Sequence, residues 1–233
     1  MESSIVQYAQ EGSVAVITMD DGKANALSPT MLEAIGSAFD KAEKDAKAVV
    51  LAGRPGRFCA GFDLKIMVTG PDAAMSMIMQ GGELFLRLYE FPKPIVMAVT
   101  GHALAGGVLL AATGDIRIGV LGEFKLGLNE VQNNMPVPVL AHELARDRLT
   151  AKELLPAVAH AKIYNPESAV EAGWLDRAVE GENLASEAMA TATKLSALPS
   201  FAYATSKKSL RTQTIEYVRS TMDANLAALT GKL

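Results

Sequence analysis

A pair of glycines in a long apolar run could do chemistry through the backbone alone. Gly106 and Gly107 stand between an apolar segment headed by Pro94 and a segment rich in alanine and leucine, within 93–120. Glycine lets another group approach the main chain closely. The first N–H groups of a helix lack intrahelical acceptors and carry partial positive charge, so they can hold an anion or a developing oxyanion. The run predicts a strand, a glycine-containing turn, a helix and a second strand.

Two further features are candidates for a site. The loop from Arg57 to Leu64 is apolar, is interrupted by Gly61 and contains the only cysteine, Cys59, so we expect it to line something. Glu130 follows a short strand expected within 123–132, at a turn into a helix. From spacing alone, the simpler interpretation of Glu130 is a capping or surface carboxylate in the first turn of a helix.

Common enzymatic signatures are absent from the sequence. It has no Gly-x-Ser-x-Gly nucleophile elbow, no phosphate loop and no Gly-x-Gly-x-x-Gly after a strand, which weighs against hydrolases, kinases and dehydrogenases. His102, His142 and His160 have no ligand spacing to one another or to Cys59, so no metal site is expected. His102 lies beside the glycine turn, but a structural role is the simpler expectation.

Composition limits the classes of protein that remain. The chain has 233 residues, 49% of them hydrophobic, and a formal net charge of −4, which argues against disorder, nucleic-acid binding and an anionic membrane surface. One cysteine excludes an intrachain disulfide and fits a reducing compartment. The first residues lack a signal-peptide pattern, and no apolar run reaches the roughly 20 residues of a membrane span, so we expect a cytoplasmic protein.

Local patterns predict the elements that position these groups. Segments 5–9 and 13–19 suit a hairpin, and 48–52 suits a buried strand. Ser28 and Pro29 begin one helix, and Asp72 can cap a methionine-rich helix that ends near Phe91. These methionines serve either irregular core packing, which we favour, or an adaptable apolar pocket.

The later part of the chain reads as mostly helical. After Leu140 the pattern is helical, with Asn165 opening one helix and Gly173 ending it. Strands thus alternate with helices early and only helices come late. This order predicts an α/β core over 1–190 and an α-helical C-terminal region over 191–233.

Two motifs together resemble the signature pair of the crotonase (enoyl-CoA hydratase/isomerase) superfamily. They are Phe58-Cys59-Ala60-Gly61-Phe62-Asp63-Leu64 and the run from Lys93 through Gly106 to Ile118, and the similarity extends to 25–27 and 165–176. The resemblance implies a core of ββα units wound as a superhelix and a C-terminal helical trimerisation region. It also implies an acyl-CoA substrate and a homotrimer or dimer of trimers.

The resemblance assigns roles to named positions. The backbone N–H groups of Phe62 and Gly106 would form an oxyanion hole for the thioester carbonyl, where one such donor is worth about 3 kcal/mol of barrier. Coenzyme A would enter as part of the substrate, with no separate cofactor. The residues that would hold it are Ala24, Ala26, Ala60, Gly61, Asp63, Leu64 and Asn129. Its phosphates could meet Lys23, Lys65 or the pair 207–208.

The choice of reaction depends on carboxylates. Family hydratases use two glutamates, and here the first of these positions is Leu109, whereas the second matches Glu130. The stretch 126–132 is similar to that of Δ3,Δ2-enoyl-CoA isomerases, which rely on one glutamate. Glu130 is therefore the expected catalytic base, among apolar groups that raise its pKa. Asp63 and Asp115 match positions that serve backbone geometry, and Glu123 is a weaker alternative base.

Several alternatives stay open at this stage. Asn133 and Asn134 replace the glycine-containing turn expected after the glutamate, so they could accept a polar acyl group or simply end the helix turn. Another crotonase reaction, including hydration of an enoyl-CoA, is the first alternative function. A non-catalytic acyl-CoA-binding subunit is the second.

Overall fold

Repeated strand pairs followed by helices build two sheets, in which most neighbouring strands are parallel. A computed structural model describes residues 4–230, with side chains to residue 225. One sheet has the order β1-β2-β3-β5-β7-β9 and the other the order β4-β6-β8. The strands are β1 Val6–Glu11, β2 Val14–Met19, β3 Ala48–Ala52, β4 Gly56–Cys59, β5 Ile95–Val99, β6 Gly101–Leu104, β7 Ile116–Val120, β8 Leu126–Gly127 and β9 Arg177–Val179.

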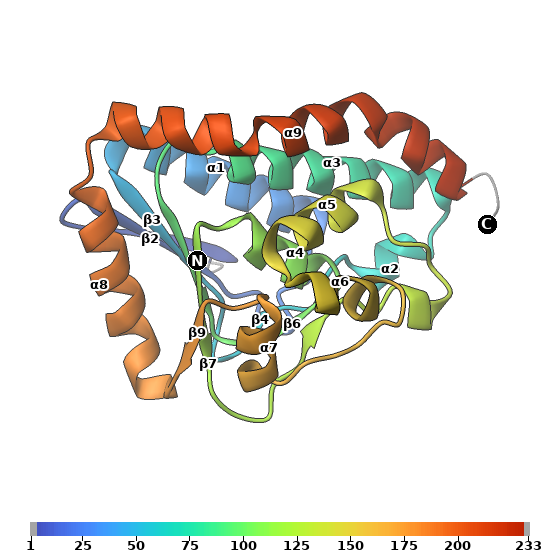
Figure 1. The fold of residues 1–233 in the computed structure, drawn as a ribbon, viewed down its shortest axis with the longest axis horizontal. Coiled ribbons are helices and arrows are strands. Elements are labelled where there is room, and N and C mark those ends of the chain that lie inside the picture. Colours follow the sequence, from blue (N-terminus) through green and yellow to red (C-terminus); the bar gives the residue numbers. More distant parts are fainter. Residues whose placement is uncertain (1–3, 231–233) are drawn as a thin grey trace.

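The helices cover these sheets and extend beyond them (Figure 1). They are α1 Pro29–Asp45, α2 Leu64–Met67, α3 Pro71–Glu90, α4 Gly106–Thr113, α5 Val139–Arg148, α6 Ala151–Val158, α7 Pro166–Ala172, α8 Leu184–Ser196 and α9 Ser200–Thr230. Two 3-10 turns, η1 Val131–Asn133 and η2 Gly181–Asn183, connect longer elements. No helix within residues 4–230 is long and apolar enough to cross a membrane.

The chain order explains the architecture. Each of three successive units sends one strand to the large sheet and the next to the small sheet: β3 and β4, β5 and β6, β7 and β8. A helix or a 3-10 turn follows each pair. Apart from the antiparallel β1–β2 hairpin, the paired strands are parallel. The predicted ββα superhelix is thereby confirmed.

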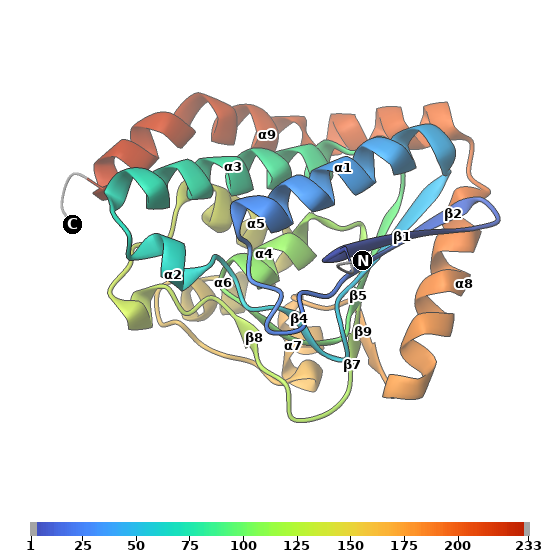
Figure 2. The ribbon, with the colours of Figure 1, turned by 180° about the vertical axis from the view of Figure 1, so that it is seen from behind.

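Two apolar layers hold the molecule together. The larger core joins one face of the large sheet to α1, α3, α4 and α5, and the smaller one packs α8 against the other face. Helix α1 packs against α3, as Figure 2 shows from behind, and α9 lies along both α3 and α5. The last helix therefore packs across both α3 and α5.

Local sequence signals are confirmed where they depend on neighbouring residues. The Ser28 side chain accepts a bond from the Met31 N–H at 3.2 Å, and Pro29 is the first residue of α1. Asn165 and Ser168 form a capping box at the start of α7, and Gly173 ends that helix with φ 104°.

Three expectations need correction. A strand, β9, lies in the half of the chain expected to hold only helices, because three half-buried residues pair with the edge of β7. The segment expected as a turn before Gly106 contains strand β6. Helix α3 begins at Pro71 after Gly70, so Asp72 lies in its first turn and does not cap it. The division of the chain at residue 190 stays a prediction.

Candidate active site

Two loops that are remote in the sequence meet at one edge of the small sheet. Strands β4 and β6 are parallel neighbours, with Cys59 opposite Ala103, so the segments after their carboxyl ends lie side by side. A Cβ atom added at Gly107 would overlap the carbonyl oxygen of Cys59, and one added at Gly61 would lie 3.2 Å from the Gly106 nitrogen. Glycines are therefore what allow these two backbones to touch.

The N–H groups of Phe62 and Gly106 are unpaired within residues 4–230, although their neighbours are paired. Leu27 N–H donates to Gly61 O at 2.8 Å, and Ala105 N–H donates to Gly127 O at 2.9 Å. Ala105 adopts φ 50°, a conformation rare for a residue with a side chain, immediately before α4. Such strain is maintained by surrounding structure and occurs often at functional sites. Two backbone donors are thus left free where the loops meet.

A cavity of about 180 Å³ lies beside these loops. Its wall brings together five of the predicted residues, which are Ala60, Phe62, Leu64, Asn129 and Glu130. Leu109, the position expected to lack a second carboxylate, lines the same cavity and is 5% exposed. The pattern of motifs thus corresponds to one physical site.

Glu130 is buried in this apolar wall. Glu130 is 9% exposed and directly precedes the 3-10 turn η1. Burial raises the pKa of its carboxyl, and hydrogen bonds from its own N–H and that of Asn129 partly offset the effect. Its Oε2 atom is buried and has no hydrogen-bond partner within the described part of the chain. A carboxylate in this state is a stronger base than one in water.

Glu130 is the one ionisable side chain on the wall of this cavity. The rest of the wall consists of apolar side chains and the amides Asn129 and Asn133. The alternative base, Glu123, is exposed and lies outside the cavity. The polar groups on this wall are therefore one carboxyl group, two side-chain amides and the backbone.

Other predicted residues support the loops from outside the cavity wall. Ala60 N–H donates to Ala24 O at 3.1 Å, and Asp21 Oδ2 accepts from Ala26 N–H at 3.4 Å. Asp63 caps α2 by accepting from Lys65 N–H at 2.9 Å. The bond between Ala60 and Ala24 ties the 24–26 segment to the 60–64 loop.

The amide pair after Glu130 divides between two roles. Asn133 lines the cavity, and its Nδ2 donates to Asn129 O at 3.0 Å. Asn134 ends the 3-10 turn with φ 57° and is not on the cavity wall. Its left-handed conformation is one that asparagine tolerates well. The turn-ending interpretation therefore holds for Asn134.

The methionine-rich helix serves both of the alternatives considered. Met77 is 1% exposed and belongs to the core, whereas Met75 and Ile78 line the cavity. Residues beyond the motifs complete the wall, namely Met67, Met135, Pro136 and Pro138. Met135 and Pro136 belong to the segment after Glu130 that the sequence placed at the acyl end of the pocket. Met67 and Pro138 had apolar character near the motifs as their only sequence signal.

Several remaining candidates have structural roles. His102 Nδ1 accepts from Lys125 N–H at 3.0 Å, and burial raises the pKa of the Cys59 thiol to about 12, which removes it as a nucleophile. Lys207 was a candidate for CoA phosphates, but its Nζ lies 2.7 Å from Asp115 Oδ2 and its side chain is only 6% exposed. That candidate is wrong, because the ion pair holds this cation inside the protein.

Asp115 has the expected role in backbone geometry. Its carboxylate accepts from Ile95 N–H at 2.8 Å and pairs with both Lys207 and Arg211. Within residues 4–230, no three side chains of histidine, cysteine, aspartate or glutamate gather as they would to hold a metal ion.

Comparisons with known proteins identify the family and the fold. A sequence model described as enoyl-CoA hydratase/isomerase matches residues 9–230. The structure of an enoyl-CoA hydratase/isomerase family protein from Pseudomonas syringae is 38% identical, with a TM-score of 0.92 over 98% of each chain. Human mitochondrial Δ3-Δ2-enoyl-CoA isomerase is 27% identical, with a TM-score of 0.93 over 97% of this chain and 91% of that one.

A further relative has a different name. A probable enoyl-CoA hydratase from Bacillus subtilis is 37% identical over 130 residues, which are 54% of this chain and 50% of that protein, so the match spans half its length. The two-sheet fold is that of the crotonase superfamily. The chain belongs to the enoyl-CoA hydratase/isomerase family.

Proposed function

We propose that this protein is an enoyl-CoA isomerase that converts a 3-enoyl-CoA into a 2-enoyl-CoA. The observation that supports the proposal is the single ionisable group, Glu130, on an apolar cavity wall beside two free backbone donors. A double-bond shift moves one proton from one carbon to another, so one carboxylate is sufficient. Burial strengthens that carboxylate as a base.

In the proposed mechanism, Glu130 removes a proton from C2 of the 3-enoyl thioester. The electrons of the C2–H bond pass into a dienolate, whose negative oxygen accepts from the N–H groups of Phe62 and Gly106. The same carboxyl group then returns the proton at C4, and the double bond lies between C2 and C3. Donors oriented in advance stabilise the dienolate because they need little reorganisation as charge develops.

Hydration would require more than this wall offers. Adding water across a double bond needs one group to hold and activate the water and another to handle the second proton. Leu109 occupies the position where family hydratases carry the other glutamate, and a hydrocarbon side chain cannot transfer a proton. We therefore rank hydration second.

The proposal also covers the binding of coenzyme A and the assembly of several copies of the chain. The 24–26 and 60–64 segments would hold the coenzyme through their backbone, and the exposed Lys23 and Lys65 remain candidates for its phosphates. We also propose a homotrimer or dimer of trimers, for which the exposed apolar side chains of α9 provide a surface.

Glu130→Gln tests the catalytic assignment. The amide keeps the shape of the side chain but cannot accept the C2 proton, so the isomerisation rate should fall by about a hundredfold to ten-thousandfold. Glu123→Gln is the matched control, because it removes the exposed alternative carboxylate and should leave the rate near wild type. Wild-type turnover by Glu130→Gln would reject the mechanism.

Two measurements on the wild-type protein separate the alternatives. Hydration of a 2-enoyl-CoA faster than isomerisation of a 3-enoyl-CoA would favour the hydratase. Calorimetric binding of CoA thioesters without any turnover would favour a non-catalytic subunit, and absence of binding would reject every CoA-based function.

A further inference from the structure

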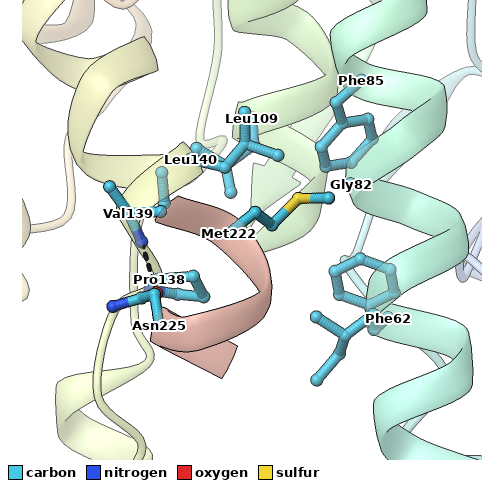
Figure 3. Close-up of a pocket in the computed structure, with 11 residues that line it drawn as sticks. Phe62, Gly82, Phe85, Leu109, Pro138, Val139, Leu140, Met222 and Asn225 are labelled. Carbon is cyan, nitrogen blue, oxygen red and sulfur yellow. Dashed lines mark hydrogen bonds between the residues drawn. The ribbon is translucent and has the colours of Figure 1, made fainter. Parts of the chain in front are cut away.

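A second, smaller cavity, called the inner cavity below, lies next to the first one. It has a volume of about 40 Å³, and Phe62, Ile78, Leu109 and Pro138 line both cavities. The inner cavity lies between α3, α4, α5 and the far end of α9, as Figure 3 shows. An acyl chain whose thioester carbonyl sits beside Phe62 N–H would reach it by extending past these shared side chains.

Met222 from α9 forms part of the wall of this inner cavity. Its residue is 6% exposed, and its side chain extends between Leu140 and Phe85 in Figure 3. A Cβ atom added at Gly82 would lie 3.2 Å from Met222 Sδ and 3.7 Å from a methyl carbon of Leu140. The thioether thus packs directly on a helix position that has no side chain.

Met222 is a flexible side chain that closes one end of the inner cavity. Methionine is unbranched, has three rotatable side-chain bonds and fills irregular gaps, so it can change rotamer at small cost. Gly82 leaves the space opposite the sulfur free of a side chain. The small volume of the inner cavity limits the length of the acyl chain, and a substitution at Met222 would change that limit.

The position of α9 over the cavity is held by Asn225. Its Oδ1 accepts from the Val139 N–H at 3.0 Å, at the first residue of α5. Pro138, the N-cap residue of α5, offers no side-chain acceptor, so α9 supplies the cap from outside the helix. The amide oxygen is thereby engaged, and the other residues at this inner end are apolar.

We propose that Met222 determines acyl-chain length in this protein, and that the substrates carry an unsubstituted hydrocarbon tail ending against its thioether. The inference rests on the proposed acyl-CoA function. It assigns the end of the tail to α3 and α9, whereas the chemistry takes place beside β4 and β6. Leu140 and Phe85 form the sides of the inner cavity, and Met222 is the side chain that changes rotamer when the acyl tail enters.

Opposite changes at one contact test the inference. Met222→Ala removes the side chain that closes the inner cavity. The ratio of kcat/KM for the longest 3-enoyl-CoA to that for the shortest should rise by about tenfold, since each buried methylene contributes roughly fourfold. Gly82→Ala confines the thioether and should lower the same ratio. Alanine is favourable within a helix, so this second variant should fold. Met79→Ala, at a partly exposed position of α3, is the control.

The outcomes distinguish a failure of the proposed role of Met222 from a failure of the proposed isomerase function. If all variants isomerise 3-enoyl-CoA with the wild-type length profile, the role of Met222 is rejected and the isomerase stands. If the wild type isomerises nothing, the proposed function fails. Calorimetry with saturated acyl-CoA thioesters of increasing length then decides about Met222, because the optimum length for binding should still move in opposite directions in the two variants.

Discussion

The protonation of one side chain controls the proposed reaction. Glu130 must be a carboxylate to accept the C2 proton, and burial raises its pKa above the ordinary value of 4.5. As the pH falls through this raised pKa, the base becomes protonated and the rate declines. We therefore expect the acidic limb of the kcat/KM profile to lie above pH 4.5, as measured by initial rates across pH.

The same measurement can contradict the burial argument. An acidic limb at or below pH 4.5 would show that the carboxyl is solvated in the free enzyme. Leu109 makes such solvation unfavourable, because its apolar side chain lines the same cavity as Glu130.

At the scale of elements, the site depends on how closely α4 approaches β4. A side chain at Gly107 would overlap the carbonyl oxygen of Cys59, which is backbone and cannot move away cheaply. Gly107→Ala should therefore destabilise the protein by about 1–3 kcal/mol and displace the Gly106 N–H, lowering activity in the surviving folded fraction. Urea denaturation and isomerase assays check both effects.

A matched glycine in another helix provides the control. A Cβ atom at Gly36 in α1 would lie 3.9 Å from the nearest atom, the Arg87 guanidinium nitrogen, which is ordinary contact. Gly36→Ala should raise the free energy of unfolding by about 0.5–1 kcal/mol through helix propensity. Equal effects of the two substitutions would contradict the close-approach argument.

At the scale of the whole molecule, α9 presents apolar side chains to solvent as well as closing the inner cavity. Leu210 and Tyr217 lie two turns apart on one side of this helix and are 84% and 50% exposed. Contiguous exposed apolar patches are typical of interaction sites, so this side of α9 is where we test the proposed trimer. Leu210→Asp should shift the proposed trimer toward monomer in analytical ultracentrifugation.

A control substitution on another helix distinguishes loss of the interface from general destabilisation of the protein. Leu155 on α6 is 62% exposed, so Leu155→Asp adds the same charge away from that side of α9. We expect this control to keep the wild-type assembly. A wild-type assembly in Leu210→Asp would show that this face of α9 is not the interface.

Much of the fold could be predicted because its signals are local. A serine before a proline predicts the start of α1, and the run around Gly106 predicts a strand and a helix, since caps and apolar runs act on adjacent residues. Strand β9 could not be predicted in this way. Three residues have no periodicity, and they form a strand only because the edge of β7 supplies the bonds.

The sequence by itself determined the family and the residue types available for chemistry, down to a leucine at position 109 and a glutamate at position 130. Only the tertiary structure decided that Glu130 is buried on the cavity shared with Phe62. It also decided that Met222 closes the inner end. Motifs record which groups are present, whereas the packing of α9 on α3 brings together side chains remote in the chain, and no local pattern encodes such a contact.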